Sequence, residues 1–440
     1  MDEIYWMPAT QLRKEMQKRN IGVEEVTKAF LNRIEKYDRR FNAVSEIHET
    51  AIKQARALDS ATRGRDALLF GLPLLVKDNI DVAGLHTTAG SMALADNLAE
   101  SNAAVIENIV HHGGIILGKT NMTEFANFTS QGMPNGYSSR GGFVKNAYDP
   151  NKNPGGSSTG SAVAVSAGFC PMAVGTDTSF SVVACATENG VVGFKPQHDS
   201  LSADGILPIA STLDSAGMFS RNLSDAILLY NGMAHRPMAS VHPIPAKELK
   251  IAVNQHNRDM VSETQWQRYE QLFEALRRDG VRFSEITQPY SPYQRSIMLC
   301  EFRRDLERYL AGASAKLKKL DQIIAFYEAN PQSMMKYGIS TLQEAAQKSV
   351  DDLLYQEAMA ERERMRGQIF EELKEYDACI MTGPTNIMHF VGLPSLALRL
   401  CEDESGIPRG IILYGADERR LLSAALTLET YCSPFVPPHL

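Results

Sequence analysis

The sequence has few cysteines and no motif that groups them. Its 440 residues include six cysteines, none of which forms a CxxC motif or belongs to a Cys/His cluster. Structural zinc sites and disulfide scaffolds both depend on such groupings. We therefore expect no metal site and a reduced, cytoplasmic chain. The six residues are Cys170, Cys185, Cys300, Cys379, Cys401 and Cys432.

Surplus positive charge is absent too. The chain has 45 lysines and arginines against 52 aspartates and glutamates, so its formal net charge is −7. A nucleic-acid-binding surface needs basic side chains to neutralise phosphates. We therefore expect no nucleic-acid partner.

Long apolar runs are missing as well. The longest, Ala162 to Gly175, is interrupted by Ser166 and Pro171, whereas a membrane-spanning helix needs about 20 apolar residues. The first ten residues, MDEIYWMPAT, carry acids where a secretory signal would carry basic residues. We expect neither a signal peptide nor contact with a membrane.

The rest of the composition is that of an ordinary globular protein, with 44% hydrophobic and 22% charged residues. We interpret residues 1–440 as one domain with four parts. Residues 1–64 have helical spacing, and residues 65–241 alternate short apolar runs with helical stretches, which predicts an α/β core. Residues 242–377 predict a mainly helical insertion, and residues 378–440 return to the core.

Individual segments carry clearer signals. Capping-box patterns at Ser262 and Thr341 predict two helix starts, the second opening a long helix to about residue 376. Helices are also predicted in 10–19, 23–41, 102–114 and 162–168. Strands are predicted in 72–80, 115–121, 378–386, 392–400 and 410–415.

One motif matches the phosphate-binding loop GxxxxGK[ST], from Gly113 to Thr120. That loop needs a strand, then exposed backbone amides, then a helix. Here a helix comes first and the interior is Ile-Ile-Leu, which favours a buried strand. We expect no NTPase, and little loss of activity on replacing Lys119.

Three other segments form an ordered set: GLPLLVKDN ending near Lys77, NPGGSSTGS around Ser157, and GTDTSFS ending at Ser181. Taken singly, each has a structural reading, such as a surface lysine or a helix cap. Taken together they offer a buried amine and hydroxyls that can carry protons.

The set resembles the amidase signature family of Ser-Ser-Lys amide hydrolases. The matching pieces are GLPLLVKDNIDVAGLHTTAGS, GKTNMTEFA, NPGGSSTGSAVAVSAG, GTDTSFS, GVVGFKP and DGILPIASTLDSAGMFSRNLSDAILL, with GIPRGIILYGADERRLLSAALTLE near the end. The similarity is strong over 65–235 and weaker elsewhere. The stretch MPNGYSSRGGFVKNAYDP looks more like the branch with peptide amidases than the glutamyl-tRNA amidotransferase branch.

The resemblance implies a central mixed, twisted β-sheet covered by helices on both faces. It implies a carboxylic or peptidic amide as substrate, no cofactor, and room for a homodimer. It places the base at Lys77, the bridging serine, after a cis peptide, at Ser157, and the nucleophile at Ser181. Supporting roles fall on Ser158 and Asp177, and backbone amides for the oxyanion on Thr178, Ser179, Phe180 and the nucleophile.

The chain departs from the family pattern GTDTGGSIRxP at positions that matter for the site. Ser179 and Phe180 replace two glycines, Val183 replaces an arginine that often lies near the aspartate, and Cys185 replaces a proline. Asp177 therefore needs another partner. We expect a negative φ at Phe180, with its ring forming a wall of the acyl pocket.

The expected mechanism requires a neutral lysine. Burial at the end of an apolar strand lowers a lysine pKa, and strand alternation directs the neighbouring Asp78 away. A cysteine nucleophile and a catalytic role for His111 or His112 are set aside, since the cysteines lie in apolar runs and the histidines end a helix. A lapsed enzyme that only binds, and an amidotransferase subunit, stay as alternatives.

Overall fold

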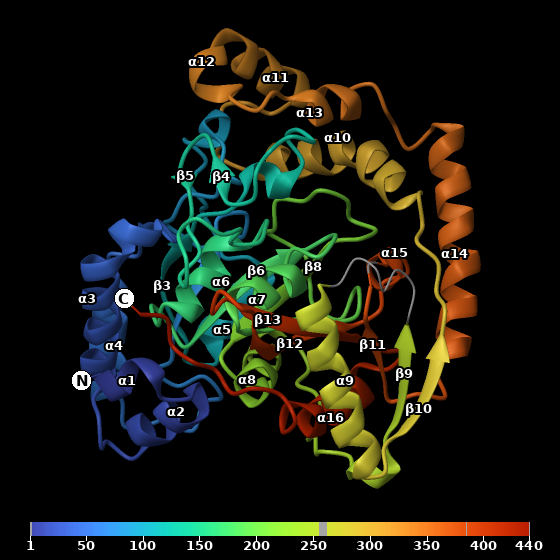
Figure 1. The fold of residues 1–440 in the computed structure, drawn as a ribbon. Coiled ribbons are helices and arrows are strands. Elements are labelled where there is room, and N and C mark those ends of the chain that lie inside the picture. The colour runs from blue at the N-terminus through green and yellow to red at the C-terminus, as the bar shows by residue number, and fades with distance from the viewer. Residues whose placement is uncertain (1, 255–261, 384, 440) are drawn as a thin grey trace.

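The computed structural model describes residues 2–254, 262–383 and 385–439. Within these residues, eleven strands form one mixed sheet in the order β1-β3-β2-β6-β8-β7-β12-β13-β11-β9-β10 (Figure 1). Helices flank both faces, as the resemblance implied. The strands of the sheet are β1 (Val44–Ile47), β2 (Pro73–Lys77), β3 (Ile115–Thr120), β6 (Met172–Asp177), β7 (Val192–Lys195), β8 (Ser215–Ser220), β9 (Lys250–Asn254), β10 (Arg282–Ile286), β11 (Ala378–Met381), β12 (Ser395–Glu402) and β13 (Pro408–Tyr414), while β4 (Tyr137–Ser138) and β5 (Gly142–Phe143) form a separate hairpin.

The helices follow the four parts of the chain. The N-terminal part and the core carry α1 (Asp2–Trp6), α2 (Ala9–Gln17), α3 (Val23–Phe41), α4 (Ala51–Ser60), α5 (Ala104–His111), α6 (Thr159–Ser166), α7 (Val183–Asn189) and α8 (Leu223–Met233). The later parts carry α9 (Glu263–Arg278), α10 (Gln294–Gly312), α11 (Leu320–Ala329), α12 (Pro331–Met334), α13 (Ser340–Ala345), α14 (Leu353–Leu373), α15 (Ile387–Phe390) and α16 (Glu418–Glu429). Short 3₁₀ turns are η1 (Met92–Leu94), η2 (Glu124–Asn127) and η3 (Ala246–Glu248).

The predicted strands and most predicted helices are confirmed, but residues 242–377 differ in two ways. They add β9 and β10, which pair in parallel at one edge of the sheet. The long helix predicted from Thr341 is wrong, since α13 ends at Ala345 and α14 starts at Leu353. Between them the Ser349 amide donates to Asp352 Oδ2 at 3.3 Å. Such local side-chain bonds compete with helix formation.

The predicted helix start at Ser262 is confirmed. Its hydroxyl accepts a hydrogen bond from the Gln265 amide, and α9 begins at the next residue. A serine in this position satisfies one of the amides that the first turn leaves unpaired.

Two neighbouring parallel strands position the candidate residues. β2 pairs with β6, with Val76 opposite Val174. Parallel strands end at the same edge of a sheet, so Lys77, the last residue of β2, and Asp177, the last of β6, lie near one another. The start of α6 covers both strands.

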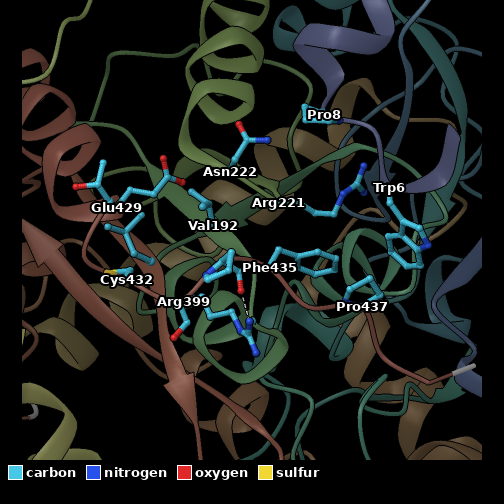
Figure 2. Close-up of a pocket in the computed structure, with 15 residues that line it drawn as sticks. Trp6, Pro8, Val192, Arg221, Asn222, Arg399, Glu429, Cys432, Phe435 and Pro437 are labelled. Carbon is cyan, nitrogen blue, oxygen red and sulfur yellow. Dashed lines mark hydrogen bonds between the residues drawn. The ribbon is translucent and has the colours of Figure 1, made fainter. Parts of the chain in front are cut away.

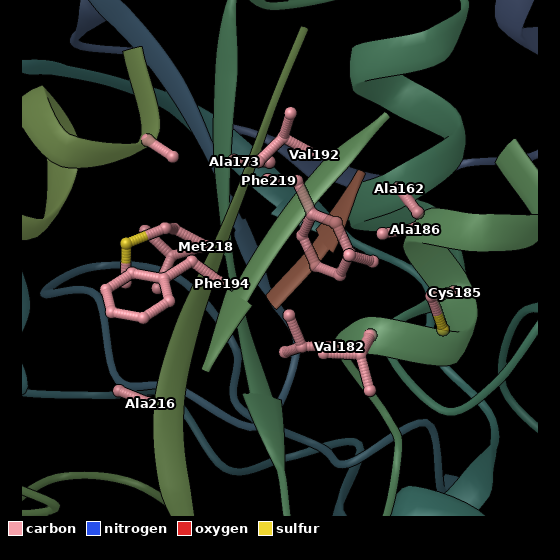
Figure 3. Packing of buried hydrophobic residues seen from close by; sticks show 14 of the residues in the cluster. Ala162, Ala173, Val182, Cys185, Ala186, Val192, Phe194, Ala216, Met218 and Phe219 are labelled. Carbon is pink, nitrogen blue, oxygen red and sulfur yellow. The ribbon is translucent and has the colours of Figure 1, made fainter. Parts of the chain in front are cut away.

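Buried hydrophobic side chains hold the next segment, α7, against β7 and β8 (Figure 3). Val182 and Ala186 are fully buried there. The strands allow this close approach because they carry glycines: a Cβ atom on Gly193 would lie 2.6 Å from the Ala186 Cβ, and one on Gly217 would lie 2.8 Å from Val182 Cγ2.

The two ends of the described chain come together beside the N-terminal helices (Figure 1). The rings of Trp6 and Phe435 lie 5.8 Å apart, and Tyr148 Oη donates to the Val436 carbonyl at 2.6 Å. Residues 433–439 are irregular, as their prolines predict. Across the described segments, no helix combines the length and apolarity needed to cross a bilayer.

The match to the phosphate-binding loop is a buried strand. Its residues 115–120 are β3, all buried, preceded by α5 and the turn at Gly113. Lys119 Nζ donates to the carbonyls of Ile80 and His86 at 2.6 and 3.0 Å and to Thr87 Oγ1 at 3.1 Å. We therefore withdraw the expectation that replacing this lysine has little effect, because three acceptors would lose their donor.

Gly118 supplies a test of this packing. Its Cα pairs with Ile47 of β1, and an added Cβ would clash with the Glu46 carbonyl oxygen. Gly118→Ala should lower the free energy of unfolding by about 1–3 kcal/mol, measured by urea denaturation. Gly132→Ala is the control, since nothing lies within 4 Å of a Cβ there. Equal stability of the two variants would contradict this account.

Candidate active site

Lys77 ends β2 with its side chain fully buried. Its Nζ donates to Ser157 Oγ and to Thr176 Oγ1, both at 2.8 Å. Burial lowers the pKa of Lys77 to about 7, although the nearby acidic groups act in the opposite direction. A substantial fraction of this amine is thus neutral at pH 7, so it can accept a proton.

Asp78, next along the chain, points away from the amine. Its carboxylate accepts hydrogen bonds from the Thr88 hydroxyl and, at 2.9 Å, from the Gly90 amide. The alternation predicted for the strand end therefore holds, and Asp78 makes its hydrogen bonds elsewhere.

Ser157 lies between the amine and the second serine. It follows a cis Gly156–Ser157 peptide bond, and its Oγ donates to Ser181 Oγ at 3.0 Å. The structure thus joins Ser181, Ser157 and Lys77 in one continuous chain of hydrogen bonds.

Ser158 sits at the cap position of α6 but does not cap the helix with its side chain. Its Oγ donates instead to the Thr176 carbonyl at 2.9 Å, and the Thr176 amide donates back at 3.3 Å. This pair ties the start of α6 to β6, and so places Ser157 above the strand ends.

Two polar residues beside the amine were missed by the sequence analysis. Thr176 accepts from Lys77, and Asn79 Nδ2 donates to the same Thr176 Oγ1 at 3.2 Å. Both residues lie inside the quoted motifs, but no local pattern shows that their side chains face the amine.

Asp177 is fully buried at the end of β6. Its Oδ2 accepts from the Val182 amide at 2.6 Å, and its Oδ1 lies 3.1 Å from His389 Nδ1. Burial alone would raise the pKa of this carboxyl, but His389, Lys195 and the amide together hold it below its ordinary value. Asp177, which lacks the arginine of the family pattern, thus has His389 of α15 as its neighbour.

The loop from Thr178 to Ser181 is held by its neighbours. Thr178 Oγ1 donates to Asp214 Oδ1 at 2.5 Å, and the Thr178 carbonyl accepts from Gln294 Nε2 at 3.1 Å. Within the described residues, the backbone amides of Ser179, Phe180 and Ser181 donate to no protein acceptor. Three adjacent N–H groups are therefore free to meet a ligand oxygen.

Phe180 does not have the negative φ that we expected. Its φ is +68°, in the left-handed region that disfavours residues with a side chain. The two glycines of the family pattern would adopt this angle without cost. The Phe180 ring is half-buried and packs edge-on against the His389 ring, with centroids 4.2 Å apart.

A cavity of about 240 Å³ borders the site. Its lining includes Asn79, Thr176, Thr178 and Asp214, and Tyr309 from α10. Burial raises the pKa of Asp214 to about 7, partly offset by hydrogen bonds from Thr178 and two backbone amides. The cavity reaches Asn79 and Thr176, the neighbours of Lys77, but Lys77 and the two serines do not line it.

A larger cavity, of about 590 Å³, lies elsewhere and contains none of the predicted residues (Figure 2). The C-terminal tail, with Phe435 and Pro437, forms one wall, and Arg221 and Trp6 line another. Size alone therefore does not mark the candidate site.

The other reactive groups lie outside the site or are unreactive. Burial raises the pKa of the Cys170 and Cys185 thiols to about 12, which opposes formation of a thiolate. His111 is exposed at the end of α5. The described residues contain no group of three or more His, Cys, Asp or Glu side chains that could hold a metal ion.

Comparison with solved structures shows close likeness over the whole chain. The structure of an amidase family protein from Bacillus anthracis str. Ames superposes with a TM-score of 0.93 at 29% identity, covering 100% of this chain and 93% of that one. Native peptide amidase from Stenotrophomonas maltophilia has a TM-score of 0.91 at 30% identity, covering 98% of each chain.

Relatives by sequence include subunits of glutamyl-tRNA(Gln) amidotransferase. A glutamyl-tRNA(Gln) amidotransferase subunit of Clostridium botulinum (strain Alaska E43 / Type E3) is 29% identical over 92% of this chain and 93% of its own length. The corresponding subunit of Clostridium acetobutylicum is 39% identical, but over 53% of this chain and only 47% of its own length.

A family model described as Amidase matches residues 25–387, which include Lys77, both serines and the loop of Asp177. This match covers most of the sheet and the whole hydrogen-bonded chain. The protein therefore belongs to the amidase family.

Proposed function

We propose that the protein hydrolyses a carboxylic or peptidic amide through an acyl-enzyme on Ser181. The observation that carries the proposal is the continuous chain from Ser181 Oγ through Ser157 Oγ to Lys77 Nζ, with steps of 3.0 and 2.8 Å. A serine hydroxyl attacks an amide only when a base takes its proton. The low pKa of Lys77 supplies that base near neutral pH.

The steps conserve protons. With Lys77 neutral, both hydroxyls turn so that Ser181 donates to Ser157 and Ser157 donates to Lys77 Nζ. Ser181 Oγ then bonds to the amide carbonyl carbon while its proton moves to Ser157 Oγ, whose own proton moves to Lys77 Nζ. The relay then runs backwards and protonates the leaving nitrogen as the C–N bond breaks. Water repeats the attack on the ester, releases the acid, and restores Ser181.

The free amides of Ser179, Phe180 and Ser181 support the negative oxygen of the tetrahedral intermediate. Donors already in place for such an oxygen lower the barrier, and loss of a single donor costs about 10²–10³-fold in rate. Side chains do not prevent this role, because the donors are backbone groups.

A second candidate, the amidotransferase subunit, is favoured by the sequence relatives. In that role the chain would act with partner subunits, and the nitrogen released at Ser181 would be transferred to glutamyl-tRNA instead of being lost to water. Ammonia release from C-terminally amidated peptides by the isolated chain supports the hydrolase. Release from glutamine that starts only when such partner subunits are added would support the amidotransferase.

Ser181 should be the only residue labelled by a broad serine-hydrolase phosphonate. Ser181→Ala should lose the label and reduce amide turnover by about 10⁴-fold or more, with an unchanged melting temperature. Ser101→Ala is the control, since that serine is exposed. Intact-mass and peptide mass spectrometry locate the label. A label on Ser157 would overturn the assignment, and an inert wild type would favour the binding protein.

The pH dependence tests Lys77. Its neutral form is the active one and its pKa is about 7, so kcat/KM should rise with pH through about 7 and then level off. Lys77→Met should reduce kcat/KM by about 10²–10⁴-fold.

Lys119→Met is the matched control, because this buried lysine of the adjacent strand has a pKa that burial lowers to about 8. It should lower the melting temperature but leave the midpoint of the pH profile in place. A wild-type midpoint near the ordinary lysine value would contradict the role of Lys77.

A further inference from the structure

Among the described residues, no arginine forms an ion pair with the buried Asp177 carboxylate. Val183, where the family pattern has that arginine, is apolar and buried. A buried carboxylate without a partner is costly, and the contact that replaces the arginine comes from a part of the chain more than 200 residues away. His389 Nδ1 lies 3.1 Å from Asp177 Oδ1, and both side chains are fully buried.

The same ring contacts the other unusual residue of the loop. Phe180 has φ +68°, and a residue with a side chain stays in this sparsely populated region only where its surroundings hold it there. The His389 ring packs against the Phe180 ring at 4.2 Å and an interplanar angle of 61°. One imidazole thus touches both ends of the turn that leads to Ser181.

The helix that carries this imidazole is firmly anchored. Asn386, before α15, accepts from the Ser291 amide and donates to the Ser291 carbonyl, each at 2.7 Å. After α15, the Gly392 carbonyl accepts from the His198 amide at 3.0 Å. Neither His389 nitrogen nor Asp177 Oδ1 makes a hydrogen bond of regular geometry in the described part of the chain. The 3.1 Å approach of Nδ1 to Oδ1 is therefore an ion-pair distance rather than an aligned hydrogen bond, and no other polar group competes for the ring.

We propose that His389 is a positioning residue for the nucleophile loop, which holds Asp177 through Nδ1 and holds Phe180 through its ring. Its effect on catalysis rests on the proposed function. It acts through the backbone: with both ends of the turn fixed, the amides of Phe180 and Ser181 and the Ser181 hydroxyl keep one orientation. A displacement of about 1 Å at a reacting group is enough to cost about 10²-fold in rate.

Variants separate the two contacts. His389→Ala removes both, His389→Asn keeps a short polar group toward Asp177, and His389→Phe keeps a ring toward Phe180. The rate constant for phosphonate labelling of Ser181 should fall about 10–100-fold in His389→Ala and less in the other two. With a reactive amide, kcat should fall while KM stays within about 2-fold.

A second background tests the link to Phe180. Glycine adopts a positive φ unaided, so Phe180→Gly removes the need for ring support. His389→Asn should therefore cost less than about 3-fold in labelling rate when combined with Phe180→Gly, and more in the wild-type background. Equal cost in both backgrounds would overturn the role of the ring contact.

Amide hydrogen exchange measures the loop without any activity. In His389→Ala the peptide covering 176–183 should exchange faster, while the β2 peptide 72–78 should not change. His86→Ala is the control, because His86 Nδ1 makes a similar contact, 2.9 Å from Glu46 Oε1, outside this loop.

The outcomes distinguish the two proposals. An inert, unlabelled wild type whose loop still loosens in His389→Ala would overturn the proposed function and support the positioning role. Unchanged exchange at 176–183 together with unchanged labelling would overturn the positioning role. If His389→Ala does not fold, His389→Asn and His389→Phe give the same comparison.

Discussion

A buried amine that shares its hydrogen bonds with two hydroxyl groups is the constraint on which the rest of the structure depends. Lys77 Nζ has no contact with solvent, so its charged form is disfavoured and hydroxyl groups must accept its N–H groups. One comes from β6 and the other from the turn before α6. The pairing of β2 with β6 and the seating of α6 on both strands are what bring these atoms to 2.8 Å.

The glycines around Ser157 allow this segment to pack closely against its neighbours. A Cβ atom on Gly155 would lie 2.7 Å from the Cys185 Cα, and one on Gly160 would lie 2.4 Å from two backbone carbonyl oxygens, of Ala43 and Asn121. These small residues leave room for neighbouring chain segments, which fixes the position of the serine between them.

The sequence predicted what depends on local pattern. The strand ending at Lys77 and the helix following Ser158 follow from apolar spacing and from residues within one turn, and both are confirmed. The break between α13 and α14 was missed, because the run after Thr341 was interpreted as one continuous helix. Family resemblance, rather than periodicity, identified the serines.

What the sequence did not predict depends on contacts between distant segments. His389 lies in a short helix with no motif of its own, and only the folded sheet brings it to Asp177. The positive φ of Phe180 likewise has no local signal, because phenylalanine ordinarily avoids that angle. β9 and β10 were missed because their pairing partners are distant in the sequence. α9 separates β9 from β10, and helices α10 to α14 separate both strands from β11.

The nucleophile loop is therefore a composite of the whole chain. Asp214 lies just before β8, Gln294 begins α10, and His389 lies in α15. Each binds a different group of the loop, so loosening one leaves the other two in place. A loop supported in this way tolerates a change of sequence when the support changes with it. Without the arginine of the family pattern, the buried Asp177 carboxylate lacks one positive neighbour. His389 and Lys195, both outside the motif, instead lower the pKa of this carboxyl against the effect of burial. His389 thus contacts both the carboxylate that the arginine at position 183 would have accompanied and the phenylalanine that replaces a glycine.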